Sequence, residues 1–211
     1  MSLNVACAVI VKDDKVFCCK RGPGKSLEGF WEFPGGKIEN GEYAYQTVVR
    51  EIKEELNSEI YPERNICYSD VNGIHMSAEL CTLVSGSLGL TEHSDSKWLT
   101  VDELDSVEWA PSDKPIVEEI KKWLFQSEYK LCLDKADTKV GDIHGGWDFN
   151  YYEEKEKLDV VLCGKMSYVK AWREFIVQIK LQQAAMKNDV NYKWRVVRLY
   201  DSSGKQIAQE S

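Results

Sequence analysis

Residues 35–60, GGKIENGEYAYQTVVREIKEELNSEI, constrain this chain more than any other stretch. After a glycine pair, which indicates a loop, apolar side chains recur at i, i+3, i+4, i+7 and i+11. These are Tyr45, Val48, Val49, Ile52 and Leu56. This spacing is typical of an amphipathic helix that packs one stripe on a core. We expect the helix to end at Asn57 and Ser58.

The polar side of this helix carries three glutamates on one face. Glu51, Glu54 and Glu55 stand at i, i+3 and i+4, so their side chains are neighbours. Like charges this close repel each other, whereas converging carboxylate oxygens are the ligands that Mg²⁺ prefers. The spacing leaves two interpretations open: a metal site, or the solvated acidic surface that paired glutamates on a helix more often form.

Charge divides the chain of 211 residues into two parts. Residues 1–127 contain 13 basic and 22 acidic residues, a net charge of −9, whereas residues 128–211 contain 14 basic and 13 acidic residues, a net charge of +1. Residues 126–150 are polar and rich in Asp and Gly, which favours a boundary near 128–145. A chain of this length forms one or two domains. We expect one domain over 1–127 and a C-terminal extension over 128–211.

The first part mixes strands with two helices. Apolar runs rich in β-branched residues and bounded by turn signals predict strands. They lie at residues 5–11, 16–21, 66–71, 75–86 and, entering a turn, 96–104. A second helix is expected over 115–125, with Ile116, Ile120 and Trp123 or Leu124 facing inward. The pattern indicates an α+β fold with a mixed sheet sandwiched between helices.

The second part is expected to form a small additional α+β domain. Residues 159–164, DVVLCG, predict a strand. Residues 165–187 predict a helix with one apolar face, although the alternation in FIVQIKL is also compatible with a strand. Residues 191–208 predict a hairpin around Asp-Ser-Ser-Gly.

The N-terminal sequence MSLNVACAVIVKDDK has neither the charged start of a signal peptide nor an apolar run long enough to span a membrane. We therefore expect a cytoplasmic protein without membrane association, whose seven cysteines stay reduced. His75, His93 and His144 stand alone, without the spacing of zinc ligands. We expect His93 in a surface loop, with a place beside Glu92 lining a cleft as the alternative.

The acidic helix and the loop before it resemble a known pattern that begins at Gly36. The segment GKIENGEYAYQTVVREIKEEL is similar to the Nudix box, Gly-x5-Glu-x7-Arg-Glu-apolar-x-Glu-Glu-x-Gly-apolar, and departs from it at Asn57 and Ser58. Because Asn is the next-best residue for a left-handed helix end, we expect the turn to persist. The resemblance spans about residues 4–127. The segment WEFPGGKIENGE makes it strongest to MutT-type nucleoside triphosphate pyrophosphohydrolases, in the branch that includes CTP pyrophosphohydrolases.

The resemblance implies the Nudix fold and a cofactor, Mg²⁺ or alternatively Mn²⁺. The implied metal ligands are the Gly36 carbonyl and the carboxylates of Glu51, Glu54, Glu55 and Glu92. The implied catalytic residues are Arg50, Glu51, Glu54 and Glu92, and either Glu51 or Glu92 takes the proton of the attacking water. Arg50 orients the carboxylates or touches phosphate, and Glu42 braces Arg50.

The implied reaction converts a nucleoside triphosphate into the monophosphate and pyrophosphate, which sanitises the nucleotide pool and so contributes to DNA repair. Oxidised dGTP, CTP and methylated dCTP lie within the range of this branch. The implied substrate-binding residues are Lys37 at the phosphates, Phe33 stacked on the base, and Arg21 and Asp113 at the base edge. Alternatives remain open: Lys37 is solvated, Phe33 and Trp31 pack in the core, or Asp113 caps a helix.

The basic part of the C-terminal extension is compatible with more than one kind of partner, or with none. Residues 165–205 contain nine Lys or Arg and three Asp or Glu, with Tyr192, Trp194 and Tyr200 interleaved. An exposed face of this kind suits single-stranded nucleic acid, whereas a strand with buried aromatic residues needs no partner. The segment could also mediate formation of a homodimer. The rival to a hydrolase is a Nudix-fold ligand sensor or partner-binding protein that uses this module; the presence of every glutamate of the box favours the hydrolase.

Overall fold

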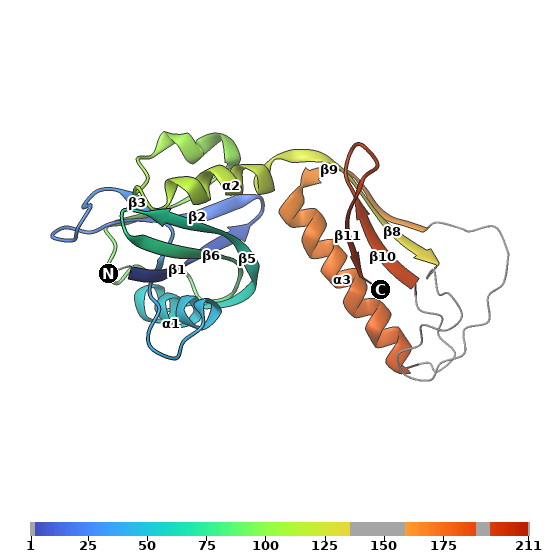
Figure 1. The fold of residues 1–211 in the computed structure, drawn as a ribbon, viewed down its shortest axis with the longest axis horizontal. Helices are drawn as coiled ribbons and strands as arrows, with labels where there is room; N and C mark the ends of the chain where they lie inside the picture. Colours follow the sequence, from blue (N-terminus) through green and yellow to red (C-terminus); the bar gives the residue numbers. More distant parts are fainter. Residues whose placement is uncertain (1–2, 136–158, 189–194, 211) are drawn as a thin grey trace. The chain divides into compact units, whose positions relative to one another are not determined.

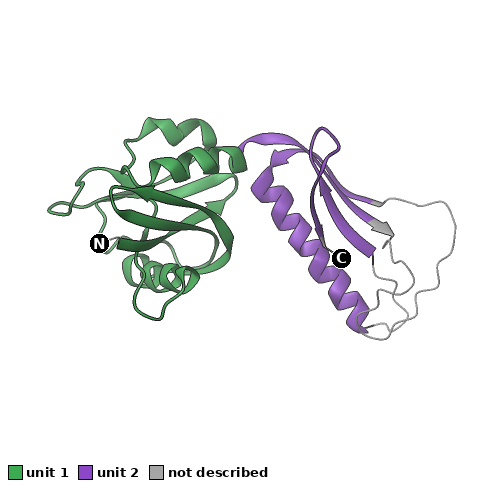
Figure 2. Ribbon diagram, in the orientation of Figure 1, with its two compact units in different colours: residues 1–124 green, residues 125–211 purple. Residues whose placement is uncertain are grey.

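The computed structural model describes residues 3–135, 159–188 and 195–210. They belong to two compact units, residues 1–124 and 125–211, each with its own hydrophobic core (Figure 2). The division falls between helix α2 (Lys114–Leu124) and strand β8 (Gln126–Lys135). The assignment of 1–127 and 128–211 as separate domains stays a prediction.

The first unit is built on a mixed sheet of seven strands. They are β1 (Leu3–Lys12), β2 (Lys15–Lys20), β3 (Trp31–Glu32), β4 (Gly35–Lys37), β5 (Glu59–Val71), β6 (Ile74–Ser85) and β7 (Asp95–Leu99). β1 pairs in parallel with β6 and antiparallel with β2 and β4. Because β1 has neighbours on both edges and helices over both faces, its residues 6–11 are buried without alternation.

Two helices cover the sheet. Helix α1 (Ala44–Leu56) lies on one face and α2 on the other, and a short 3₁₀ helix, η1 (Val101–Ser106), follows β7 (Figure 1). The core under α1 joins Ile52 and Leu56 of the helix to Ala8 and Ile10 of β1. The α+β class with a mixed sheet sandwiched between helices is therefore confirmed.

The inward stripe of α1 is narrower than its apolar pattern predicts. Val48 and Ile52 are 0 % exposed, but Tyr45 is 51 % and Val49 40 % exposed, so their expected inward position is wrong. Thr47 takes the remaining inward position. Its hydroxyl donates a hydrogen bond of 2.9 Å to the carboxylate of Glu42. The buried face of the helix thus keeps Val48, Ile52 and Leu56 of the expected stripe and extends toward residue 47.

The end of α1 preserves the expected turn. Asn57 adopts the left-handed conformation with φ 45°. The side chain of Ser58 is buried, and its hydroxyl donates to the Leu56 carbonyl at 3.0 Å and accepts from the Leu88 amide at 2.8 Å. A polar residue is tolerated at this buried position because both of these hydrogen bonds are made.

Strand β5 is longer than its sequence indicates. It begins at Glu59 rather than at residue 66, directly after the helix. The segment before residue 66 contains Pro62 and lacks alternation, and the register of β5 with β6 shifts at Pro62/Arg64 and at Asn65/Cys67. Because β5 is an edge strand, proline and these irregularities are accommodated.

The second unit is a small sheet with one helix. Its strands are β8, β9 (Asp159–Ser167), β10 (Arg195–Tyr200) and β11 (Gln206–Glu210), in the order β11-β10-β8-β9, all antiparallel. Helix α3 (Tyr168–Asn188) packs on the sheet through Phe175 and Ile179 against Leu131, Val197 and Leu199. The additional α+β region is confirmed, and the strand alternative for FIVQIKL is wrong because this segment lies inside α3.

The first ten residues of the polar stretch over 126–150 form β8. Leu131 and Cys132 are 1 % and 0 % exposed there, so two central apolar residues outweigh the polar composition. The expected hairpin is confirmed, because β10 and β11 pair across a turn organised by Asp201. His144, Tyr192 and Trp194, with the rest of the polar stretch after residue 135, lie outside the described residues.

The expectations about membrane association and about the cysteines can be compared with the structure. Among the described helices, none combines the length and the apolar character needed to cross a membrane. The seven cysteines all lie in the described ranges and are free thiols.

We predict that Ile52→Ala lowers the stability of the first unit by about 2–5 kcal/mol, because it removes a fully buried side chain and leaves a cavity. Val49→Ala, on the same helix but 40 % exposed, is the matched control and is expected to change stability by less than about 1 kcal/mol. Native-state hydrogen exchange of the β1 amides measures both. Equal effects of the two substitutions would contradict the packing of α1 described above.

Candidate active site

The glycine pair of β4 lies between β1 and the acidic face of α1. β4 pairs with β1 through Gly36 opposite Ala6 and Gly35 opposite Cys7. A Cβ atom on Gly35 would lie 2.2 Å from the Ala6 carbonyl oxygen, and one on Gly36 would lie 2.1 Å from Oε1 of Glu51. A larger residue would displace the sheet or the carboxylate, so the two glycines set how closely sheet and helix approach.

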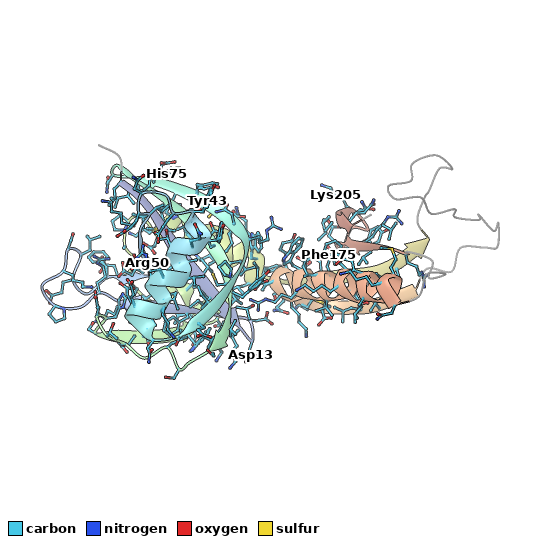
Figure 3. All side chains as sticks on the ribbon, turned by 90° about the horizontal axis from the view of Figure 1, so that it is seen from below. Asp13, Tyr43, Arg50, His75, Phe175 and Lys205 are labelled. Atoms are coloured by element: carbon cyan, nitrogen blue, oxygen red, sulfur yellow. The ribbon has the colours of Figure 1, made fainter. Side chains whose placement is uncertain are left out.

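Arg50 lies on α1, where Figure 3 labels it, and its guanidinium group pairs with the neighbouring carboxylates. Its Nε and Nη2 donate to the two oxygens of Glu42 at 2.8 and 2.9 Å, and Nη1 donates to Glu51 at 2.7 Å and to Glu54 at 3.4 Å. Nη2 also donates to the Lys37 carbonyl at 3.2 Å, which ties the helix to β4. The bidentate hydrogen bonds from Arg50 lower the pKa of Glu42 to about 2.

One carboxylate oxygen of Glu55 is buried at the acidic face. Its Oε2 is buried and has no hydrogen-bond partner in the described part of the chain. Burial raises the pKa of Glu55 to about 7; His93 opposes this shift, whereas Glu51, Glu92 and Glu32 add to it. A buried carboxylate without a partner is costly, and a cation bound at this position would remove that cost.

Residues 91–94 lie against the end of α1 and bring Glu92 close to Glu55. The amide and hydroxyl groups of Thr91 donate to the Glu55 carbonyl at 3.0 and 2.7 Å, which satisfies a carbonyl at the end of α1. Glu92 follows directly and forms an ion pair with Lys25. The hydrogen bond from Lys25 lowers the pKa of Glu92 below its ordinary range.

The acidic residues fit a divalent cation in their chemistry, although they do not surround one as they stand. In residues 3–135, 159–188 and 195–210, no group of three His, Cys, Asp or Glu side chains is close enough to hold a metal ion. Arg50 and Lys25 instead pair with Glu51, Glu54 and Glu92. Carboxylate oxygens are the donors that Mg²⁺ and Mn²⁺ take, and the unpartnered oxygen of Glu55 lies among them.

A second charged group, which the sequence did not reveal, adjoins Glu55. Glu32 accepts a hydrogen bond from Nη1 of Arg21 and lies 3.2 Å from Nε2 of His93. The His93 side chain is 3 % exposed, so its expected place in a surface loop is wrong. The reason is that the Ser94 amide donates to the Lys20 carbonyl at 3.0 Å, which draws the segment onto β2.

The alternation of side chains along β3 could have predicted the position of Glu32 from the sequence. Trp31 and Phe33 are 6 % and 2 % exposed, so both pack in the core. In an extended segment the residue between two inward residues points to the other side, which is where the acidic group lies. No comparable pattern in the sequence indicates that His93 is buried, because its burial depends on a contact between a loop and β2.

Phe33 and Asp113 are brought together, but away from solvent. The ring of Phe33 packs on Trp109 with centroids 4.8 Å apart, and its amide donates to Oδ1 of Asp113 at 2.8 Å. Asp113 is 1 % exposed, and burial raises its pKa to about 7. Its other oxygen accepts from the Ser112 hydroxyl at 3.0 Å. The side chain thus joins the start of α2 to the segment after β3.

The structure therefore separates the expected residues into two groups. Around the acidic face of α1 it brings together Gly36, Arg50, Glu51, Glu54, Glu55 and Glu92. Lys37 is exposed on the adjoining strand β4. Arg21 is tied to Glu32 and, through Nε, to the Ser26 carbonyl at 2.6 Å, whereas Phe33 and Asp113 are enclosed.

Known proteins match the first part of this chain. The sequence model of the NUDIX domain family matches residues 2–120. The chain is 32 % identical over 120 residues to the CTP pyrophosphohydrolase of Escherichia coli strain K12, covering 55 % of this chain and 89 % of that protein. It is 28 % identical over 128 residues to the putative 8-oxo-dGTP diphosphatase 2 of Mycobacterium tuberculosis strain H37Rv, covering 57 % and 89 %.

A solved structure is also similar in sequence. The MutT protein of methicillin-resistant Staphylococcus aureus 252 is 34 % identical, with a TM-score of 0.49, over 57 % of this chain and 96 % of that chain. The family match ends at residue 120 and so lies within the first unit.

We predict that Arg50→Gln raises the pKa of Glu42 from about 2 toward 4.5, because Arg50 is the main cause of the shift. The pair stabilises the fold above the ordinary carboxyl pKa, and this contribution is lost as the pH falls from about 4.5 toward 2. NMR titration of the side-chain carboxyl carbons measures the pKa. Glu103, whose pKa is lowered by Thr100, is the internal control and keeps its shift. An unchanged pKa of Glu42 would refute the assigned role of Arg50.

Proposed function

This chain belongs to the Nudix hydrolase family, and from that premise we propose that it hydrolyses nucleoside triphosphates to the monophosphate and pyrophosphate with Mg²⁺ as cofactor. The observation that carries the proposal is the unpartnered, buried oxygen of Glu55 among Glu51 and Glu92. The relatives named as CTP pyrophosphohydrolase and putative 8-oxo-dGTP diphosphatase 2 support CTP or oxidised dGTP as substrate, and methylated dCTP is proposed as a further candidate. The role that follows is sanitation of the cytoplasmic nucleotide pool.

The proposed metal ligands are the Gly36 carbonyl and the carboxylates of Glu51, Glu54, Glu55 and Glu92, for Mg²⁺ or alternatively Mn²⁺. When bound, the metal neutralises the polyphosphate and stabilises charge on the attacking and leaving oxygens. Arg50 fixes the directions of Glu51 and Glu54 through its hydrogen bonds of 2.7 and 3.4 Å. Glu42 in turn holds Arg50 from the opposite side.

The proton of the attacking water goes to Glu51 or Glu92. Glu51 has a side chain that is 14 % exposed and lies against the backbone of Gly36. The Lys25–Glu92 pair lowers the pKa of Glu92, which weakens Glu92 as a proton acceptor while that pair is intact. Both residues remain candidates for the general base.

Four residues are proposed to recognise the substrate. Lys37, exposed beside the acidic face, contacts the phosphates, and Arg21 contacts the base edge. Phe33 and Asp113 are 2 % and 1 % exposed in this structure, so we assign them to the wall against which the base rests. The Phe33 amide and the Asp113 carboxylate fix each other's position there through their hydrogen bond of 2.8 Å.

The different class of function, a ligand sensor or partner-binding protein, is less well supported. A sensor needs none of the box carboxylates for chemistry, yet Glu51, Glu54 and Glu55 are all present. Arg195 and Arg198 of the basic module donate hydrogen bonds within the second unit, to the Leu133 carbonyl at 2.8 Å and to Gln209 at 3.0 Å. Nothing in these contacts favours nucleic acid or a homodimer over solvent.

We predict that Glu54→Gln lowers pyrophosphate release by about a hundredfold or more, because it removes a charged ligand at the reacting phosphate. The measurement is a turnover screen across nucleoside triphosphates with Mg²⁺. Glu118→Gln is the matched control, since Glu118 is an exposed carboxylate of α2 paired with Lys121. If no nucleoside triphosphate is cleaved, or if the Glu54 variant is as active as the parent, the proposed function fails.

We also propose residues 1–127 and 128–211 as two domains with chemistry confined to the first. The expected result of deleting residues 128–211 is a kcat/KM within about threefold of the full chain, because a unit with its own core folds alone. The same turnover assay measures it. Loss of activity in a folded, truncated protein would show that the second domain shapes the active site.

A further inference from the structure

Lys25 is a charged residue at the acidic site whose role the proposed function does not assign. It lies in the connection between β2 and β3, and its ammonium group pairs with Oε2 of Glu92. The side chains of Lys25 and Glu92 are 37 % and 53 % exposed. The pair is therefore accessible to ions from solvent and joins two loops that are 67 residues apart in sequence.

The connection is held in a defined shape. The Arg21 amide donates to the Phe30 carbonyl at 2.9 Å, and the Gly29 amide donates back to the Arg21 carbonyl at 3.2 Å. Within the loop, the Gly24 amide donates to the Glu28 carboxylate at 2.9 Å. These hydrogen bonds close the loop at its base and at its tip, so Lys25 is carried by an ordered support.

The loop also lies directly against the segment that carries Glu92. A Cβ atom on Gly22 would lie 2.7 Å from the Glu92 carbonyl oxygen, so the two backbones are in contact. The Ser94 amide donates to the Lys20 carbonyl at 3.0 Å on the other side of this contact. Lys25 therefore reaches Glu92 across a short, fixed distance rather than as a freely moving surface lysine.

Glu92 has two competing uses for its charge. It lies close enough to Glu55 to add to the rise in the pKa of that carboxyl, so it belongs to the same acidic group. An ammonium ion held on a carboxylate neutralises it and occupies the lone pairs that a metal ion would take. Lys25 supplies a paired positive charge to Glu92, as Arg50 does to Glu51 and Glu54.

We propose that Lys25 is a positioning residue that competes with the divalent cation for Glu92, so that cation binding must break the Lys25–Glu92 pair. This inference rests on the proposed function, because it takes Glu92 as a metal ligand. Displacement frees the Lys25 ammonium group, while the backbone contact between Gly22 and Glu92 stays in place. The pair thus keeps Glu92 neutralised until the cation arrives.

The test measures Mn²⁺ binding to the full chain by electron paramagnetic resonance of free Mn²⁺, without substrate. Lys25→Ala is expected to tighten Mn²⁺ binding about two- to fivefold, since exposed ion pairs contribute modestly. Lys25→Arg keeps the positive charge and the pair, and is expected to bind Mn²⁺ like the parent. Lys122→Ala removes a comparable surface pair with Glu119 on α2 and is the matched control, with no change expected.

A second background separates competition at Glu92 from general electrostatics. In a Glu92→Gln protein, Lys25→Ala is expected to leave Mn²⁺ affinity unchanged, because no carboxylate remains for the two cations to share. An unchanged affinity in the Lys25→Ala protein overturns the proposal, and so does a gain that persists in the Glu92→Gln background. Either failure leaves the proposed function standing, since that is decided by turnover of the parent and of Glu54→Gln.

Discussion

The structure depends on the close approach that Gly35 and Gly36 permit. On one side of this pair is the backbone of the central strand β1, and on the other is the carboxylate of Glu51. Side chains at these positions would force the loop away from either partner, because Cβ atoms would lie near 2 Å from Ala6 and Glu51. The glycines therefore connect the core of the first unit to its acidic surface.

That approach brings negative charges together at a cost that the protein offsets only in part. Arg50 forms ion pairs with Glu42, Glu51 and Glu54, so one positive charge offsets part of the repulsion among three carboxylates. Glu55 keeps one buried oxygen that has no hydrogen-bond partner among the residues that the structure describes. Such local defects occur where a site is built for a ligand rather than for stability.

Much of this arrangement could be predicted from sequence, because it follows from local periodicity. Apolar spacing predicts helix α1 and the sandwiched sheet. Turn residues predict the end of α1 at Asn57 and the β10–β11 hairpin. The grouping of Arg50 with Glu51 and Glu54 follows from helical geometry together with the resemblance to the Nudix box.

What sequence did not predict depends on contacts between distant segments. Tyr45 and Val49 are apolar and correctly spaced, yet tertiary packing turns them outward. His93 is buried because residues 91–94 fold onto α1 and β2, and Glu32 becomes part of the site because His93 and Arg21 reach it. The early start of β5 depends on pairing with β6, which overrides Pro62.

The proposed cation site consists of the acidic face of α1 and the Gly36 backbone. Amide NMR spectra during titration with Mn²⁺ test this site, because paramagnetic broadening falls steeply with distance from the ion. The amides of residues 36, 51–55 and 92 are expected to broaden first, and Glu54→Gln is expected to shift this onset to higher Mn²⁺. Broadening that begins elsewhere, or that is the same in the variant, would contradict it.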